Sequence, residues 1–263
     1  MMSGAMETPP PSPSPSRKPA MGRAGVGLAI LAGGGSRRMG QDKALKPFLG
    51  RPLIERVLAR LAGLADEIFV VANRPEQFTF LNLPLYSDLI PGRGVLGGLY
   101  TALAVAQAPL LAVAACDMPF ASAALFAYEA AFLAAGQPFV DQSTTFVEQA
   151  APFSVDAAMP SGEHGLEPLH AVYRRETCLP LVRAALDAGE WKLISWLSRA
   201  KVRYIIPAEL AEVDPLYGGP RGEPSPADAS NPGAPLAFWN LNTPQEFAQA
   251  EDVARRHPES QAR

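Results

Sequence analysis

Hydrophobic and polar positions follow two periods along the chain, and this pattern predicts its elements from residue 26 onward. Short, continuously apolar runs typical of buried strands occupy residues 26–31, 68–72, 85–87 and 110–115. Between these runs, residues 52–61 and 96–106 place their apolar side chains at helical spacing. Strands that alternate with helices in this way indicate βαβ units. We therefore predict an α/β fold with a mainly parallel sheet.

The pattern continues toward the C-terminus with less regularity. We predict a helix at residues 123–135, capped by Ser122. Later strands are expected at 138–141, 170–173, 202–206 and 238–240, and later helices at 176–188, 191–200 and from 244. Residues 142–167 and 207–235 carry many polar and turn-forming residues instead. We interpret 207–235 as a flexible insertion in a single domain that spans residues 25–263.

Composition separates a tail from this domain and narrows its class. Residues 1–24 interleave Pro with Ser, which predicts a disordered tail. The remaining chain is long and apolar enough for a sizeable core, since 48% of all residues are hydrophobic. A net charge of −3 argues against a general nucleic-acid-binding protein. Cys116 and Cys178 make neither a disulfide framework nor a zinc set, which suits a reducing cytoplasm.

Targeting signals are not expected either. No apolar run approaches the roughly 18 residues of a membrane span. The apolar run from residue 26 follows basic residues, but it is at the lower limit of length for an export signal. We therefore predict a cytoplasmic protein that does not associate with membranes.

The clearest chemical signal lies in residues 31–43, which read Leu-Ala-Gly-Gly-Gly-Ser-Arg-Arg-Met-Gly-Gln-Asp-Lys. The glycines let backbone amides approach a ligand, and the hydroxyl, guanidinium and ammonium groups that follow suit a phosphate. A Walker loop needs Lys directly after its last glycine, and a dinucleotide fingerprint needs a small residue where Arg38 stands, so both are excluded. The remaining alternative is a flexible turn with solvated charges.

Polar side chains also follow the next three predicted strands: Asn73, Asp88 and Asp117. In an open parallel sheet, ligands bind beyond the carboxyl ends of the strands. A carboxylate such as that of Asp117 can hold Mg²⁺ there. Two alternatives stay open at this point. In the first, Asp117 only caps the following helix; in the second, the glycine-rich segment after Asp88 is a plain turn before a helix.

Residues 31–43 resemble the signature of the molybdenum cofactor guanylyltransferases, the MobA family, whose pattern is Leu-Ala-Gly-Gly-x-Ser-x-Arg-Met-Gly-x-Asp-Lys. Every fixed position is matched, whereas cytidylyl-transferring relatives usually carry Ala where Gly34 stands and lack the pair Asp42 and Lys43. The resemblance implies a Rossmann-like three-layer α/β/α nucleotidyltransferase domain. It also implies a Mg²⁺-dependent transfer of GMP from GTP to molybdopterin or molybdenum-molybdopterin, with release of pyrophosphate.

The same resemblance implies roles for individual residues. Arg38 and Lys43 would hold the outer phosphates of GTP, and Asp117 would be the Mg²⁺ ligand. The residues implied in nucleotide binding are Leu31, Ala32, Gly33, Lys43, Asn73, Asp88 and Asp117. Residues 240–244 resemble the family's Asn-x-Asn-Thr-Pro, in which an Asn can position a phosphate and Thr243 can cap a helix.

The chain departs from the family at two positions. Val95 stands where the family has Pro, and Val71 stands where it often has a nucleotide-contacting Asn, which makes the assignment of Asn73 an indirect one. The three histidines, His164, His170 and His257, have no metal-ligand spacing and are interpreted as core or surface residues.

Two rival functions remain from the same fold: a molybdopterin cytidylyltransferase and a sugar-1-phosphate nucleotidyltransferase. A rival of another class is a catalytically silent protein that delivers the cofactor, against which the intact Lys43 and Asp117 count. The expected partners are GTP, molybdopterin or molybdenum-molybdopterin, and molybdoenzyme-maturation proteins, with no nucleic acid.

Overall fold

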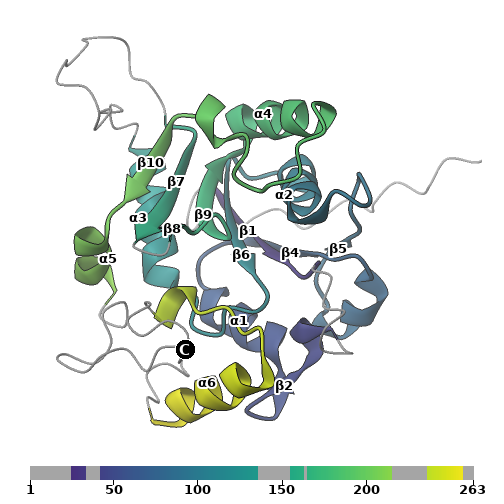
Figure 1. The fold of residues 1–263 in the computed structure, drawn as a ribbon, viewed down its shortest axis with the longest axis vertical. Helices are drawn as coiled ribbons and strands as arrows, with labels where there is room; N and C mark the ends of the chain where they lie inside the picture. The colour runs from purple at the N-terminus through teal and green to yellow at the C-terminus, as the bar shows by residue number, and fades with distance from the viewer. Residues whose placement is uncertain (1–24, 34–41, 136–154, 163–164, 215–235, 257–263) are drawn as a thin grey trace, which may run out of the picture.

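The structure is a computed structural model, and it describes residues 25–33, 42–135, 155–162, 165–214 and 236–256 (Figure 1). The tail, the strand predicted at 138–141 and most of the segment 207–235 lie outside these ranges. Arg38 lies outside them as well.

An eight-stranded sheet crosses the described part of the chain. One half consists of four parallel strands, β1 (Val26–Leu31), β4 (Glu67–Val71), β5 (Leu85–Tyr86) and β6 (Leu110–Ala115). β1 pairs with β6 on one side and with β4 on the other. Every residue of β6 is buried, which explains why its sequence is continuously apolar.

The other half of the sheet is built around a reversed strand. β9 (His170–Arg174) runs antiparallel to β6 on one side and to β7 (Ala157–Gly162) on the other. β10 (Val202–Ile205) pairs parallel with β7, and β8 (Gly165–Leu166) pairs antiparallel with its end. The strand order is β10-β7-β9-β6-β1-β4-β5, and the prediction of a mainly parallel sheet is confirmed.

Helices cover both faces of this sheet (Figure 1). α1 (Leu53–Leu61), α3 (Ala123–Ala134) and α5 (Pro207–Val213) pack on one face, and α2 (Gly94–Val105) and α4 (Arg175–Asp187) on the other. Successive residues of a strand point to opposite faces, so Ile30 of β1 belongs to the first core and Leu31 to the second. The result is the predicted three-layer α/β/α arrangement.

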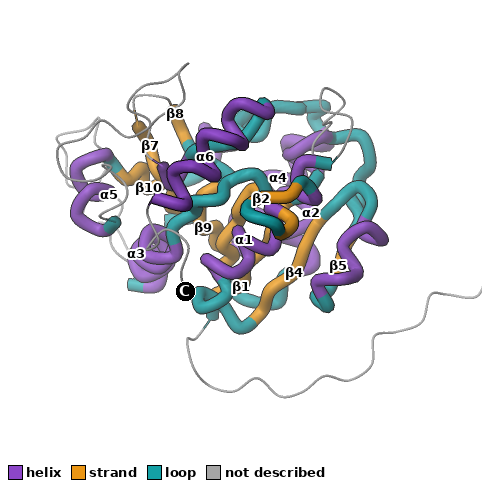
Figure 2. Tube along the Cα trace, turned by 90° about the horizontal axis from the view of Figure 1, so that it is seen from below, coloured by secondary structure: helices purple, strands orange, loops and turns teal. Residues whose placement is uncertain are grey.

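A third apolar cluster lies where the C-terminal segment meets a small hairpin. The hairpin consists of β2 (Pro47–Phe48) and β3 (Arg51–Pro52), and α6 (Pro244–Arg256) lies beside it in both views (Figures 1 and 2). The side chains that form the cluster are Phe48, Leu53, Phe120, Leu236, Trp239, Leu241, Phe247, Ala250, Val253 and Ala254. The backbone N–H of Leu49 also donates to Glu251 Oε1 at 2.8 Å, which fixes the hairpin to α6.

Two predicted elements are wrong. The helix expected at 191–200 is replaced by turns and a short 3₁₀ helix, η3 (Leu197–Arg199). The strand expected at 238–240 is replaced by another 3₁₀ helix, η4 (Leu236–Phe238), closed by a bond from Trp239 N to Leu236 O of 3.0 Å. η4 packs its apolar side chains against neighbouring helices, and among the described strands none pairs with it.

Other elements were not predicted from the sequence. β7 and β8 fall in the segment expected to be rich in turns, and α5 occupies the start of the segment 207–235. Two further 3₁₀ helices are η1 (Lys43–Leu45) and η2 (Pro75–Leu81).

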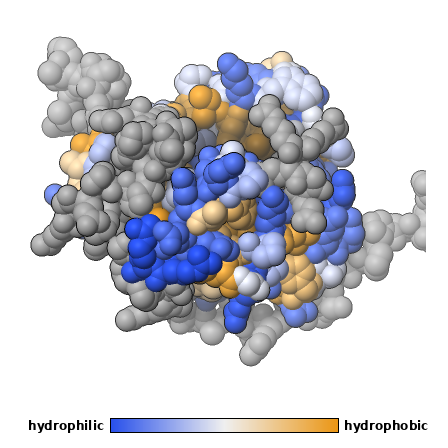
Figure 3. Space-filling model, turned by 60° about the horizontal axis from the view of Figure 1, so that its bottom comes forward, coloured by the Kyte–Doolittle hydropathy of each residue, from blue (hydrophilic) through white to orange (hydrophobic). Residues whose placement is uncertain are grey.

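The surface shows no single dominant apolar area on the face drawn in Figure 3, where apolar and hydrophilic patches alternate. Of the helices that the structure describes, none combines the length and apolar character required to cross a bilayer.

Candidate active site

The carboxyl ends of the central strands bring the predicted site residues to one edge of the sheet. Ala32 follows β1 and donates its N–H to Val71 O of β4 at 2.8 Å, while Cys116 N, after β6, donates to Leu31 O at 3.2 Å. These bonds extend the pairing of three strands to the point where their polar residues begin. A side chain added at Gly33 would meet Asn73 Nδ2 at 3.5 Å, so Asn73 lies directly against the start of the glycine loop.

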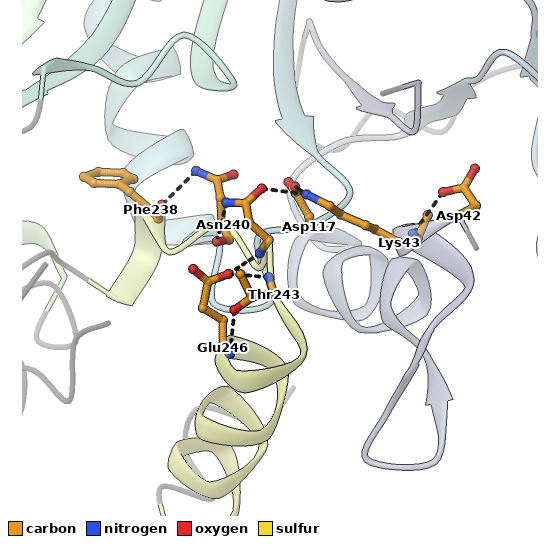
Figure 4. A network of polar contacts seen from close by, with 9 residues as sticks. Asp42, Lys43, Asp117, Phe238, Asn240, Thr243 and Glu246 are labelled. Atoms are coloured by element: carbon orange, nitrogen blue, oxygen red, sulfur yellow. Dashed lines mark hydrogen bonds and ion pairs between the residues drawn. The ribbon is translucent and has the colours of Figure 1, made fainter. Parts of the chain in front are cut away.

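Lys43 and Asp117 meet at this edge (Figure 4), and Asn242 contacts Lys43 there. Lys43 Nζ lies 3.5 Å from Asp117 Oδ2 and donates a hydrogen bond of 2.6 Å to Asn242 Oδ1. Asp42 orients Lys43, because its carboxylate accepts from Ala44 N at 3.1 Å and caps η1. One ammonium group thus joins the end of the glycine-loop segment, the end of β6 and the start of α6.

The carboxyl group of Asp117 is mostly buried, with 20% of the side chain exposed. Burial raises its pKa above the ordinary value, and the neighbouring Lys43 ammonium lowers that pKa in part. The carboxylate form at this position therefore depends on nearby positive charge. Burial and the charge of Asp117 also raise the pKa of the Cys116 thiol, which disfavours the thiolate, and the side chain packs partly buried against the core.

The start of α6 holds Asn242 in place. Thr243 Oγ1 accepts from Glu246 N at 3.2 Å, and Glu246 Oε2 in return accepts from Thr243 N at 2.7 Å and from Asn242 N. This is a capping box, so the predicted cap by Thr243 is confirmed. Asn242 Nδ2 donates to Asn240 O at 3.1 Å, which leaves its carbonyl oxygen turned toward Lys43.

Two arginines of α1 were missed by the sequence analysis. Arg56 Nε donates to Pro119 O and Arg60 Nε to Ala121 O, each at 3.0 Å. Both guanidinium groups therefore bind the backbone of the loop that follows Asp117. Burial lowers the pKa of Arg56 to about 10, so it remains charged at neutral pH. Their spacing of four residues on an otherwise apolar helix was the available signal.

Asp88 lies at the same edge but in a separate group. A side chain added at Gly98 would meet Asp88 Oδ1 at 3.8 Å and Leu31 Cδ1 at 3.7 Å, which places this carboxylate over the first turns of α2. Burial raises its pKa. Among the described residues no ion pair joins Asp88 to Lys43. Asp88 follows β5 and Asp117 follows β6, so the strands that carry these two carboxylates lie on opposite sides of β1.

Arg38 and the three histidines remain among the residues that the sequence analysis singled out. Arg38 lies outside the described residues, so the structure does not place it. His170 is fully buried, as expected for a core residue, whereas His164 and His257 lie outside the described ranges. In the part of the chain that the structure describes, no three side chains of His, Cys, Asp or Glu gather as a preformed metal cage.

Comparison with known sequences identifies relatives of this chain. Residues 28–202 match the family described as "MobA-like NTP transferase domain". A probable molybdenum cofactor guanylyltransferase from Carboxydothermus hydrogenoformans is 36% identical over 185 residues, covering 70% of this chain and 83% of the relative. The molybdenum cofactor guanylyltransferase of Desulfosudis oleivorans is 30% identical over 223 residues, covering 84% and 92%.

Solved structures share the fold. The molybdopterin-guanine dinucleotide biosynthesis protein A from Archaeoglobus fulgidus superposes with a TM-score of 0.65 at 24% identity, covering 87% of this chain and 98% of that one. This similarity confirms the predicted nucleotidyltransferase-type α/β/α fold.

Proposed function

The chain belongs to the family of MobA-like NTP transferase domains, and on that premise we propose that it transfers GMP from GTP to molybdopterin or molybdenum-molybdopterin. The products are the guanine dinucleotide form of the cofactor and pyrophosphate. The names of the similar guanylyltransferases support guanine as the base and molybdopterin as the acceptor.

The observation that carries the proposal is the contact of Lys43, Asp117 and Asn242 at the carboxyl edge of β6. An ammonium group beside a largely buried carboxylate suits a site that must hold a triphosphate together with a counter-cation. Gly33 and Asn73 lie against each other on the neighbouring strands, where bare backbone lets a nucleotide approach.

The reaction requires no covalent participation of the protein. An oxygen of the acceptor's terminal phosphate attacks the α-phosphorus of GTP, a new P–O bond forms, and the bond to the β-phosphate oxygen breaks as pyrophosphate leaves. That acceptor oxygen is largely ionised at pH 7, so a general base is not needed. Lys43, together with Arg38, stabilises the charge that develops on pyrophosphate, while Asn242, held in place by the capped start of α6, orients the Lys43 ammonium through its Oδ1.

The residues present fit Mg²⁺ as the cofactor. A magnesium site in a nucleotide enzyme takes one or two carboxylates and completes its coordination with phosphate oxygens and water. Asp117 supplies such a carboxylate, and Asn242 supplies an amide oxygen beside it. When bound, Mg²⁺ would neutralise charge on the α-phosphate and help to align it with the incoming oxygen.

The test is pyrophosphate release by the purified protein with each of the four nucleoside triphosphates, with molybdopterin and Mg²⁺ present. We expect turnover with GTP and the mass of the guanine dinucleotide cofactor among the products. Turnover with CTP in its place would indicate the cytidylyltransferase. Binding of GTP without pyrophosphate release would indicate a delivery protein. Turnover that occurs only when a sugar 1-phosphate replaces molybdopterin would indicate a sugar-1-phosphate nucleotidyltransferase.

The remaining expectations about the cellular setting follow from this proposal. Molybdoenzyme-maturation proteins would receive the product, and the reaction would take place in the cytoplasm. Co-purification of the protein with such factors from cytoplasmic extract would support both expectations.

A further inference from the structure

Helix α3 and strand β9 bury a polar pair, Glu129 and His170, that the proposed reaction does not use directly. Both side chains are fully buried. His170 Nδ1 lies 3.5 Å from Glu129 Oε1, and within the described part of the chain neither carboxyl oxygen nor Nδ1 has a hydrogen-bonding partner. Burying polar groups without such partners costs free energy of folding. A pair of apolar side chains would avoid this cost.

The other ring nitrogen fixes the tautomer of His170. Ser122 donates its backbone N–H to His170 Nε2 at 3.2 Å, so Nε2 carries no proton. The proton of the neutral ring is therefore on Nδ1, which faces Glu129. Burial lowers the pKa of His170 to about 3 and raises the pKa of Glu129 well above its ordinary value. His170 is therefore an uncharged imidazole at neutral pH, and burial favours the neutral carboxyl group of Glu129 beside it.

His170 contacts both segments that carry the candidate site. Its acceptor bond holds Ser122, the last residue of the loop that begins at Asp117. Its ring stacks on Phe126 of α3, with 3.9 Å between the ring centroids, and meets the edge of Phe238 at 5.2 Å. Phe238 belongs to η4, the segment that leads to the Asn residues before α6.

A backbone bond joins the same two segments on the side of the site. Leu241 N donates to Asp117 O at 3.0 Å, between the carboxylate of Asp117 and the amide of Asn242. The Asp117 loop and the Asn242 segment are thus joined at the site by Leu241 and behind it by His170. The Leu241 bond and the His170 contacts together restrict how the segment of Asn242 lies against the loop of Asp117.

We propose that Glu129 and His170 are positioning residues: Glu129 keeps the proton of His170 on Nδ1, and His170 in turn anchors the loop of Asp117 and the segment of Asn242 in their relative positions. The inference rests on the proposed function. Transfer between two phosphates depends on alignment, and a displacement of about 1 Å can cost on the order of 10²-fold in rate. Residues that orient a group holding a metal typically change activity by about 10- to 100-fold.

Glu129→Leu separates a positioning role from a structural one. Replacing a buried ionisable group by an apolar one of similar volume is often neutral or stabilising, so we expect no loss of thermal stability. His170 then loses the carboxyl oxygen that faces Nδ1 at 3.5 Å, and Ser122 loses its acceptor whenever the proton moves to Nε2. We expect kcat for pyrophosphate release to fall about 10-fold while KM for GTP stays within about twofold, because the glycine loop and Lys43 still bind the nucleotide.

Two further variants accompany it. Glu129→Gln resembles the protonated carboxyl group in shape and keeps an oxygen that can face Nδ1, so its kcat should stay close to that of the wild type. Tyr128→Phe removes a neighbouring polar group of α3 that bonds Glu209 at 3.3 Å and should leave kcat unchanged.

The tautomer is measured directly by ¹⁵N NMR of histidine-labelled full-length protein. The sequence contains only three histidines, and His170→Phe identifies the signals of His170. We expect a protonated Nδ1 and a bare Nε2 in the wild type and a mixture of tautomers in Glu129→Leu. A wild-type Nε2 that carries the proton, or a kcat of Glu129→Leu equal to that of the wild type, would overturn the inference. If the wild type releases no pyrophosphate at all, the proposed function fails instead, while the NMR result still decides the tautomer.

Discussion

At the scale of single residues, Lys43 is the group on which the proposed chemistry most depends. Its ammonium is held between Asp117 and Asn242, and its side chain is only 17% exposed. A positive charge fixed in a largely buried site stabilises developing phosphate charge more than a solvated one would. The next three predictions concern this residue and its carboxylate partner.

Lys43→Ala should lower kcat for pyrophosphate release by about 10²-fold or more, the usual effect of removing one fixed electrostatic stabiliser. The matched control is Lys46→Ala, which removes a lysine of the same segment whose Nζ lies over the ring of Phe247 at 5.5 Å. Near-normal turnover by the first variant would remove Lys43 from the mechanism. A similar loss in both variants would point to a general effect of charge.

The same substitution should act in the opposite direction on metal binding. Without nucleotide, the Lys43 ammonium lies beside Asp117 and competes with any cation for its carboxylate. Lys43→Ala should therefore raise the affinity of the nucleotide-free protein for Mn²⁺, used as a spectroscopic substitute for Mg²⁺ and titrated by EPR. An unchanged or weaker affinity would mean that Asp117 does not hold the metal in the free protein.

Asp117→Asn should strongly lower Mg²⁺-dependent turnover and keep part of the affinity for GTP. The amide preserves shape and one oxygen, but it lacks the charge that a hard cation requires. Turnover measured against Mg²⁺ concentration should show a lower maximum that needs more metal. Asp187→Asn, at an exposed ion pair of α4, is the control. Superimposable curves for the wild type and Asp117→Asn would leave Asp117 with a structural role alone.

At the scale of elements, the site depends on where helices begin. η1 starts at Lys43, α6 starts just after Asn242, and Ser122 caps α3 through a bond of 3.2 Å to Leu125 N. Each start is fixed by a side-chain cap, so the backbone of the site is defined by local hydrogen bonds as well as by the sheet.

Thr243→Ala should show this dependence. Loss of the cap costs about 1 kcal/mol, which corresponds to about 2–4 °C in the melting temperature of a chain of this size. We also expect a lower kcat, because Asn242 shares the capping carboxylate of Glu246. Thr79→Ala, in the exposed turn of η2, is the matched control for both measurements. A melting temperature lowered without any change in kcat would separate the cap from the site.

The elements also show how far sequence patterns reach. The strands and helices around the site were predictable, because their apolar periodicity and the carboxyl-edge rule both depend on local sequence. β7 was not, since Pro160 and Gly162 are unfavourable in strands, and burial of Ala157 to Met159 overrides that preference. In place of the helix expected at 191–200, turns and η3 bury Trp196 and Leu197, a long-range packing effect that helical spacing does not encode.

The candidate site also has a part that the sequence predicts and a part that it does not. Gly33, Asn73, Asp88 and Asp117 each follow a strand, so their common edge could be predicted from order along the chain alone. The bond from Lys43 to Asn242 joins residues 199 positions apart and results from packing of α6 on the hairpin. No local pattern encodes that contact.

At the scale of the whole molecule, the described domain begins at the amino end of β1, which is a central strand of the sheet. Gly25 O accepts from Leu110 N at 3.1 Å, next to the first pair of β1 with β6. Removal of residues 1–24 should therefore leave every described pairing of the sheet in place. We expect the melting temperature and kcat to stay within error of the full-length values. A melting temperature lower by several degrees would show that the tail stabilises the domain.

The packing of α6 against the hairpin has a consequence for synthesis on the ribosome. The described strands of the sheet have all been synthesised by residue 205, but Asn242 and most of the third apolar cluster come from the segment after residue 235. A nascent chain that has folded its sheet still exposes Phe48 and Phe120 and lacks the partner of Lys43. We expect such a chain to bind GTP but not to catalyse the transfer of GMP, because Asn242 is not yet present. Catalytic competence would therefore arise only after α6 has been synthesised and has docked on the hairpin.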